Sequence, residues 1–233
     1  MVPLTSSVAT VVAAEAPNPW FSSSYLRSNY DTILSALGEH VILTVVSVLV
    51  GAVVAMPLAL IARRSKLLST FVLGGSTVVY TIPSLAMFAF VYPFTGLSRE
   101  TVIVGLVLYS LVILVRNFLA GLQAVPADVR EAALGMGYGP ARMLLLVEIP
   151  MALPTFFAGL RIATVSTVAL VTVGVIVGHG GLGNILISGF NSNFFRAPIA
   201  AAALLTVLLA LTLDLVLATV ARVLTPWARG RAA

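Results

Sequence analysis

Cysteine is absent from the 233-residue sequence, and lysine occurs once, as Lys66. The absence of cysteine excludes disulfide bonds and thiolate metal sites, and it leaves the redox compartment open. A nucleotide-binding P-loop needs a lysine followed by serine or threonine, whereas Lys66 is followed by Leu67. The sequence therefore predicts no ATP site, no metal site and no cofactor on this chain.

Charged residues are scarce as well. They make up 9% of the chain, against about 25% in a typical soluble domain, and hydrophobic residues make up 60%. With a mean hydropathy of +1.09, the chain is predicted to be an all-α integral membrane protein. The length allows one membrane domain, so we expect any large solute-binding or nucleotide-binding domain on another chain. The basic residues behind the net charge of +5 are spread along the chain, which does not indicate nucleic-acid binding.

Five apolar runs are candidates for membrane spans. They cover approximately residues 40–62, 67–93, 101–115, 155–177 and 198–220. A helix rises about 1.5 Å per residue, so about 20 residues cross the hydrocarbon core, and the third run is short by that measure. Pro57 is expected to kink the first helix, and Pro83 is expected to bend or break the second near Tyr80 to Ser84.

The distribution of basic residues predicts the orientation of these spans. With the N-terminus outside, three basic residues lie on the outer side, namely Arg27, Arg99 and Arg196. Ten lie on the inner side: Arg63, Arg64, Lys66, Arg116, Arg130, Arg142, Arg161, Arg222, Arg229 and Arg231. Because cytoplasmic loops carry the excess of Lys and Arg, we predict five transmembrane helices with the N-terminus outside and the C-terminus inside.

A mixed-charge segment at residues 126–154 separates the third and fourth runs. Pro126 can begin a helix, since its missing N–H would be unbonded there, and Asp128 suits the positive end of the helix dipole. Gly135 and Gly137 are expected to end that helix after about ten residues. It is too short to cross a bilayer, and the predicted orientation places it in the cytoplasm.

This segment resembles the EAA loop of ABC-importer permeases, whose pattern is E-A-A, three residues, G, nine residues and I-x-L-P. Every spacing matches, and the departures are Val147 for I and Ile149 for L. In that family the loop is a cytoplasmic coupling helix that docks in a cleft of the ATPase subunit. The resemblance implies this coupling role for Glu131, Ala132, Ala133 and Gly137, and it implies the type I importer permease (MetI-like) fold. The alternative is an ordinary amphipathic connector, which would suffice to explain a bare EAA tripeptide.

Three further motifs resemble those of permeases for glycine betaine, carnitine and choline. They are Thr81-Ile82-Pro83-Ser84-Leu85-Ala86, Val115-Arg116-Asn117 and Gly178-His179-Gly180-Gly181-Leu182-Gly183. The last formally matches the dinucleotide fingerprint, but no βαβ context accompanies it. A plain extracellular turn explains its glycines equally well, with His179 as a polar turn residue rather than a ligand.

Together these resemblances cover about residues 36–225 and point to the osmoprotectant branch. They imply two ATPase subunits that hold ATP and Mg²⁺, a second permease copy or a related permease, an extracytoplasmic binding protein, and the bacterial cell membrane as location. The expected division of the chain is an extracytoplasmic tail and interfacial segment at 1–36, a permease domain at 37–225 and a cytoplasmic tail at 226–233. In the first part, a first-turn anchor or plain disorder are alternatives to the interfacial segment.

Polar groups near the expected break and on the fourth span are candidates for a translocation path. They are Thr77, Tyr80, Thr81, Pro83, Ser84, Thr164, Ser166, Thr167 and Thr172. Broken backbone is tolerated in a membrane where it lines a cavity, although Ser and Thr hydroxyls can also bond to their own helix carbonyls. A quaternary ammonium would need aromatic faces, for which Tyr80, Phe88, Tyr92 and Tyr109 are available. Aromatic belts at the membrane surface explain most such residues.

Asp214 lies inside the fifth run, where a carboxylate is costly in hydrocarbon, and Arg161 is its expected partner. We favour a structural ion pair or a water-facing position over a gate. Two other functions remain open. The nearest is the same machine carrying another small solute, such as an amino acid. From a different class, an ATP-independent channel or secondary transporter is the rival, although no internal repeat supports it.

Overall fold

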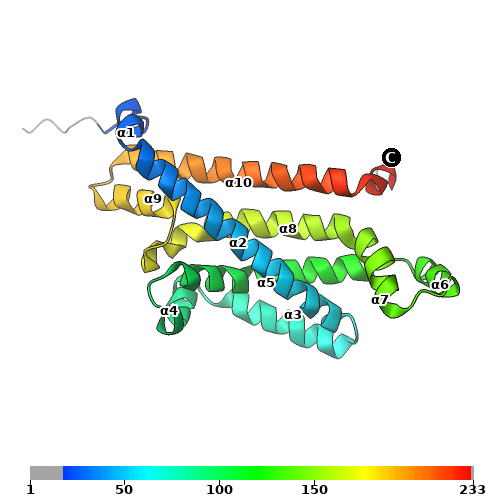
Figure 1. The fold of residues 1–233 in the computed structure, drawn as a ribbon. Helices are drawn as coiled ribbons and strands as arrows, with labels where there is room; N and C mark the ends of the chain where they lie inside the picture. Colours follow the sequence, from blue (N-terminus) through cyan, green and yellow to red (C-terminus); the bar gives the residue numbers. More distant parts are fainter. Residues whose placement is uncertain (1–17, 232–233) are drawn as a thin grey trace, which may run out of the picture.

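Long apolar helices run between the two ends of the molecule, whose computed structural model describes residues 18–231 (Figure 1). The helices are α1 (Ser23–Ser28), α2 (Tyr30–Ala62), α3 (Lys66–Thr81), α4 (Ser84–Thr95), α5 (Arg99–Gln123), α6 (Ala127–Gly135), α7 (Pro140–Met143), α8 (Ile149–Val171), α9 (Leu182–Asn191) and α10 (Arg196–Leu224). A π-helical turn, Leu144–Glu148, joins α7 to α8, and 3₁₀ turns cover Thr172–Val177 and Pro226–Arg231.

Four stretches are long and apolar enough to cross a membrane: Tyr30–Ala62, Arg99–Gln123, Pro140–Val177 and Arg196–Leu224. A fifth span arises if α3 and α4, which meet at a bend of 99°, count as one. The break lies at Ile82 and Pro83, where the sequence predicted it. The prediction of five spans in an all-α membrane protein is confirmed with this bent pair included.

The third span is longer than the sequence indicated. It was expected to end at Arg116, but α5 continues to Gln123. The exposed Arg116 guanidinium donates a hydrogen bond to Thr77 Oγ1 on α3 at 2.9 Å. Asn117 donates to the carbonyl of Ile113 one turn back, at 2.8 Å. Both polar groups are therefore satisfied along the helix, and the charge does not end it.

Two other spans also differ from their expected bounds. α2 begins at Tyr30 rather than at His40 and continues through Pro57 to Ala62. The fourth span begins at Pro140, so Arg161 lies near its middle and not at its inner end. Removing Arg161 from the inner set leaves nine basic residues there against three outside, so the predicted orientation stands.

The core lies where α5 packs between α2 and α8. One buried cluster combines Ala55, Ala59 and Ala62 of α2 with Leu114, Val115, Phe118, Leu119 and Leu122 of α5 and Ala152, Phe156 and Ala163 of α8. Small residues on α2 and α8 allow the helix backbones to approach α5 closely. Gly159 is one such position, because a Cβ there would lie 2.5 Å from the Cβ of Asn117.

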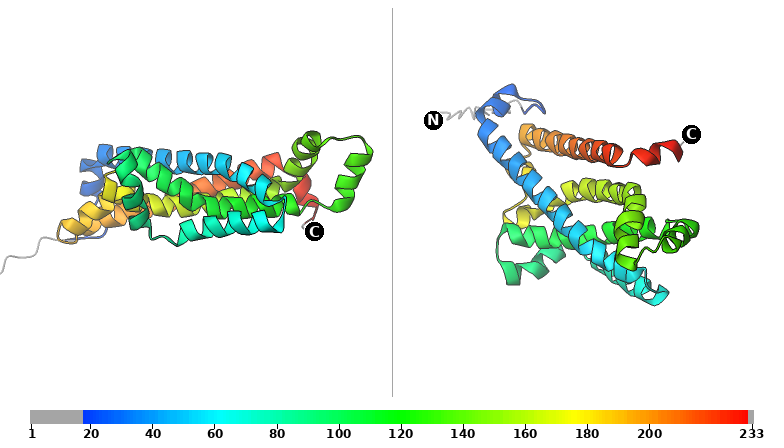
Figure 2. Two further views of the ribbon diagram at one scale, coloured as in Figure 1. Left: turned by 90° about the horizontal axis from the view of Figure 1, so that it is seen from below. Right: turned by 45° about the vertical axis from the view of Figure 1, so that its right-hand side comes forward.

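The two ends of the molecule carry different elements. α6 and α7 project beyond one end, on the same side as the C-terminal part of α10 (Figures 1 and 2). α1, α9 and the start of α10 lie at the opposite end. Since Arg63, Arg64 and Arg130 lie at the α6 end, the positive-inside rule assigns that end to the cytoplasm. Residues 1–17, which make up nearly half of the expected N-terminal part at 1–36, lie outside the described part of the chain.

A buried histidine fixes the outer end of the fourth span. The fully buried His40 ring accepts a hydrogen bond from Leu182 N–H through Nδ1 at 3.3 Å, so its Nε2 donates to Val168 O at 3.0 Å. Gly181 has φ +52°, and a Cβ there would lie 2.8–2.9 Å from atoms of His40. The glycine-rich turn is thus a close contact with α2, and it leads into α9, a helix that the sequence analysis did not identify.

The close contact at Gly159 makes a test of this packing. Gly159→Ala is expected to lower the melting temperature of the purified protein by several degrees, because overpacking costs about 1–3 kcal/mol. Gly38→Ala is the matched control, since a Cβ there meets nothing within 4 Å. That variant should be neutral or slightly stabilising, as alanine is the better helix former. Equal melting temperatures for the two variants would contradict the packing described.

Candidate functional site

The cytoplasmic end presents a short exposed helix, α6. Pro126 stands at its N-cap and Asp128 in its first turn. Gly137, at φ +79°, reverses the chain after the helix, and Tyr138 N–H closes the turn on Ala133 O at 3.1 Å. The left-handed backbone at this position favours glycine. A helix of nine residues that stands outside the bilayer and is tied back by a glycine turn is suited to contact with a soluble partner.

The expected coupling residues in and after α6 differ in exposure. Glu131, Ala132 and Gly137 are exposed, whereas Ala133 is buried against the rest of the chain. Leu134 and Met136 are 60% and 67% exposed. These two apolar side chains lie beside Glu131 in the sequence and offer a partner contacts that the motif comparison did not include.

A buried carboxylate lies behind α6. Glu148 Oε2 accepts from Arg63 Nη1 at 2.5 Å, and Oε1 pairs with Arg130 Nε at 3.0 Å. Arg130 belongs to α6, Arg63 ends α2, and Glu148 ends the π-helical turn before α8. Arg130 also donates to the carbonyl of Leu122, in the last turn of α5, at 2.7 Å. Two hydrogen bonds and the Arg130–Glu148 ion pair thus join four elements at the cytoplasmic end.

The break in the second span is held by a tyrosine from α5. Pro83 has no N–H and stands at the N-cap of α4, which leaves backbone carbonyls without helical partners. The hydroxyl of Tyr109 donates to the freed carbonyl of Ile82. The Tyr109 ring also packs edge-on against Tyr80, with the centroids 5.7 Å apart. The bend is therefore a fixed feature supported by the neighbouring helix.

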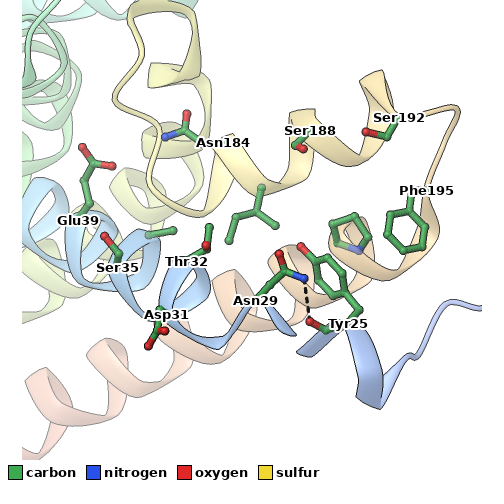
Figure 3. Close-up of a pocket in the computed structure, with 13 residues that line it drawn as sticks. Tyr25, Asn29, Asp31, Thr32, Ser35, Glu39, Asn184, Ser188, Ser192 and Phe195 are labelled. Carbon is green, nitrogen blue, oxygen red and sulfur yellow. Dashed lines mark hydrogen bonds between the residues drawn. The ribbon is translucent and has the colours of Figure 1, made fainter. Parts of the chain in front are cut away.

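A pocket of about 650 Å³ opens at the extracytoplasmic end (Figure 3). Hydroxyl and amide side chains of the α2 region face those of α9, namely Asn29, Thr32, Ser35, Asn184, Ser188 and Ser192. Asp31 and Glu39 add carboxylates, and the described residues that line the pocket include no Lys or Arg. Glu39 is already paired with His179 Nδ1 at 2.8 Å and Arg99 Nε at 3.5 Å. The ring of Tyr25 packs edge-on against Phe195, and burial raises the pKa of its hydroxyl, which keeps it neutral.

Comparison with known proteins decides the family. Residues 47–229 match the model of the binding-protein-dependent transport system inner membrane component. The chain belongs to this family. It is therefore a multi-pass inner-membrane permease, the transport subunit of an ABC importer.

Curated relatives cover most of the permease. The chain is 36% identical over 203 residues to the glycine betaine/carnitine/choline transport system permease protein OpuCD of Bacillus subtilis (strain 168), covering 87% of this chain and 89% of the relative. It is also 36% identical over 207 residues to the osmoprotectant import permease protein OsmW of Salmonella typhimurium, covering 87% of this chain and 96% of the relative.

Solved structures share the fold of the permease. An inward-facing MetNI methionine ABC transporter aligns with a TM-score of 0.73 at 23% identity, covering 81% of this chain and 94% of that chain. An amino acid ABC transporter aligns with a TM-score of 0.68 at 19% identity, and the alignment covers 86% of this chain and 98% of that chain. At these identities the likeness shows the fold alone.

The candidate path residues fall into three groups in the permease. Tyr80, Thr81 and Pro83 are exposed on one chain, whereas Thr77, Ser84, Ser166 and Thr172 are partly buried. Thr164 and Thr167 are buried inside the chain, so they line no open surface in this conformation. The hydroxyls of Thr77, Thr81 and Thr172 donate to Leu73, Val78 and Ala169 carbonyls of their own helices, the alternative that the sequence left open.

The four aromatic candidates do not form a cage within one chain. Phe88 and Tyr109 are buried in the core, while Tyr80 and Tyr92 are nearly half exposed. The rings of Tyr80 and Tyr109 pack edge to face against each other. Of these two rings, only Tyr80 has an exposed surface that could contact another molecule.

Arg161 and Asp214 lie in contact between α8 and α10. Two parallel hydrogen bonds of 2.7 Å join Arg161 Nε and Nη2 to the two carboxylate oxygens of Asp214. This bidentate geometry is the strong form of an arginine–carboxylate pair. The pair lies near the middle of both spans, where an unpaired charge would face hydrocarbon or a partner chain.

Sequence reasoning missed the roles of four residues, three of which meet at the cytoplasmic end and one of which lies at the outer end. Glu148 occupied a variable position of the motif, and Arg63 and Arg130 were counted only as topology signals. His40 was taken only as the start of an apolar run. An acidic residue beside Pro150 at the foot of a span is itself unusual, and that signal would have identified Glu148 as a buried charge that needs a partner.

A double-mutant cycle tests the Arg161–Asp214 pair. Arg161→Gln and Asp214→Asn should each lower the melting temperature of the purified permease by several degrees, because each leaves an uncompensated charge within the spans. The double variant should lose less than half of the summed decrease, since no charge remains unpaired. Arg27→Gln, an exposed arginine at the outer end, is the control for loss of one charge. Fully additive decreases would show that the two residues act independently.

Proposed function

We propose that this permease imports osmoprotectants, namely glycine betaine, carnitine, choline or similar quaternary amines. The observation that carries the proposal is the identity of 33–36% over 202–207 residues to several permeases named for these substrates. The Thr81–Ala86 and Gly178–Gly183 motifs support the same branch. The amino-acid transporters that share the fold are too distant in sequence to bear on the substrate.

Energy for import comes from a separate ATPase subunit. The chain contains no P-loop, and its one lysine is outside any such motif. Two ATPase subunits would hold ATP and Mg²⁺ and receive α6 in a surface cleft, with Glu131, Leu134 and Met136 facing them. A short helix with small residues seats closely in a groove, which fits the exposed Ala132 and Gly137. Closure of the ATPase pair on ATP would then move α6.

A second permease copy, or a related permease, completes the path. The large apolar side chains on the outer faces of α3, α4 and α10 are exposed in one chain, and these faces are available to lipid or to a partner. The exposed side of the break, with Tyr80, Thr81 and Pro83, lies on such a face. An extracytoplasmic binding protein would deliver substrate at the end that carries α1, α9 and the pocket between α2 and α9.

The substrate is tested by uptake into proteoliposomes that contain the permease, its ATPase and its binding protein. Radiolabelled glycine betaine, choline or carnitine should accumulate when ATP is enclosed with the ATPase, and labelled methionine should not. Accumulation of methionine alone would favour the amino-acid alternative. Uptake that continued without ATP would favour a channel or secondary transporter.

Gly137 offers a test of the coupling surface. Gly137→Asn should fold normally, because asparagine tolerates positive φ and a Cβ there meets nothing within 4 Å. The added side chain should keep the ATPase from seating, with at least a tenfold loss of ATP-driven uptake and of ATPase co-purification. Gly139→Asn is the control two residues away, in extended backbone and open space. Normal uptake by Gly137→Asn would remove this residue from the contact.

A further inference from the structure

Glu148 is a charged residue whose side chain is almost fully buried. Its side chain is 8% exposed, and each carboxylate oxygen has an arginine of its own. A buried carboxylate is retained only when its desolvation is offset by such partners. The two partners come from different elements, since Arg63 ends α2 and Arg130 lies in α6.

α6 has few other attachments to the membrane domain. Among its side chains Ala133 is the buried one, and Arg130 reaches both Glu148 and the Leu122 carbonyl. Within the described residues, the Arg130–Glu148 pair is thus the polar connection between α6 and the base of the fourth span. A force applied to α6 reaches α8 through this pair and through the α7 turn.

The backbone at Glu148 departs from regular α-helix at the base of the fourth span. Leu144–Glu148 forms a π-helical turn, and Pro150 follows with no N–H to donate. A proline ring clashes with the carbonyl four residues back, and the wider turn relieves that clash. Such turns occur frequently at functional sites. The carboxylate therefore lies at the irregular turn of the fourth span that is nearest to α6.

We propose that Glu148 is the positioning residue that transmits movement of α6 to the fourth span, an inference that rests on the coupling role given above to α6. Arg130 moves with α6 and carries the carboxylate with it, and the carboxylate turns the base of α8 at the π-helical turn. Arg63 holds the same carboxylate, so the cytoplasmic end of the first span moves together with the fourth. A hollow of about 310 Å³ beside the three side chains leaves room for the guanidinium groups to shift.

A purely structural role would have a different signature. If Glu148 only neutralised two arginines, loss of either arginine would change stability and leave the coupling of ATP hydrolysis to transport intact. If it transmits movement, Arg130→Gln should reproduce Glu148→Gln, since both cut the connection to α6. Arg63→Gln should have a smaller effect, because it leaves that connection in place.

The test uses the full complex of permease, ATPase and binding protein in proteoliposomes. ATP hydrolysed per osmoprotectant transported is measured for Glu148→Gln, Arg130→Gln and Arg63→Gln, together with melting temperature and ATPase co-purification. Glu148→Gln and Arg130→Gln should each raise the ratio of ATP hydrolysed to osmoprotectant transported at least tenfold, with the ATPase still bound. Arg130→Lys, which keeps the charge, should restore at least half of the coupling. Arg64→Gln, a neighbouring arginine that lines the same hollow, should match the wild type.

An unchanged ratio in Arg130→Gln, or a fall in hydrolysis and uptake in proportion to melting temperature, would overturn the proposal.

A second readout does not depend on the substrate. Because the chain has no cysteine, spin labels can be placed at Ala127→Cys on α6 and Ile162→Cys on α8, both exposed. In the wild-type background their distance within one permease should change by at most about 2 Å when ATP is added, since the base of α8 moves with α6 and Ile162 lies between that base and the fixed contact at Val168. In Glu148→Gln the distance should change by several ångströms, and an unchanged distance would contradict the inference. A wild-type complex that hydrolyses ATP but accumulates no osmoprotectant would refute the proposed substrate alone.

Discussion

A bilayer offers no water to backbone N–H and C=O groups, so each departure from α-helix inside the membrane needs a partner from the protein itself. The described spans depart from regular helix at three places, and at two of them a side chain from another helix supplies such a partner. Tyr109 donates to Ile82 O at the break in the second span. His40 bridges Val168 O and Leu182 N–H where the fourth span becomes a 3₁₀ turn. Glu148 fixes the third departure, the π-helical turn, through its side chain instead of the backbone.

Charged side chains within the spans also need partners from the protein itself. Glu148 and Asp214 each lie in a span, and each is held by arginine at 2.5–3.0 Å. The two sites differ in exposure, since Glu148 is nearly closed off whereas Asp214 is 30% exposed and Arg161 is 42% exposed. Glu148 is therefore accessible to its two arginines and to little else, while the Arg161–Asp214 pair lies on a surface that lipid or another chain must cover.

Much of the membrane fold follows from local sequence. Apolar runs, the break at Pro83, the helix after Pro126 and the predicted orientation each depend on a few neighbouring residues. The structure places the break and the short helix as expected, and it lengthens several of the spans. What could not be predicted depends on contacts between distant segments. α5 continues past Arg116 because Thr77 on another helix accepts its hydrogen bond. Ala133 faces inward because α6 folds back on the chain, and no periodicity in nine residues reveals that.

The same distinction applies to the candidate site. The E-A-A-x₃-G spacing identified the surface that a partner can contact, because a motif records residues at fixed separation along one segment. It did not identify Arg63, which lies 85 positions from Glu148 and meets it only in the folded chain.

The arrangement of the fourth span shows why these distant contacts matter. Its outer end is held at Val168 by His40, and its base is held at Glu148 by two arginines. Twenty residues of helix separate the two points, which is about 30 Å. With the outer contact fixed, a displacement of about 3 Å at the base tilts this length by roughly 6°. In the proposed coupling, a helix held at both ends by side-chain contacts, with its π-helical turn at the base, converts a small movement of α6 into a tilt of the helix between the two contacts.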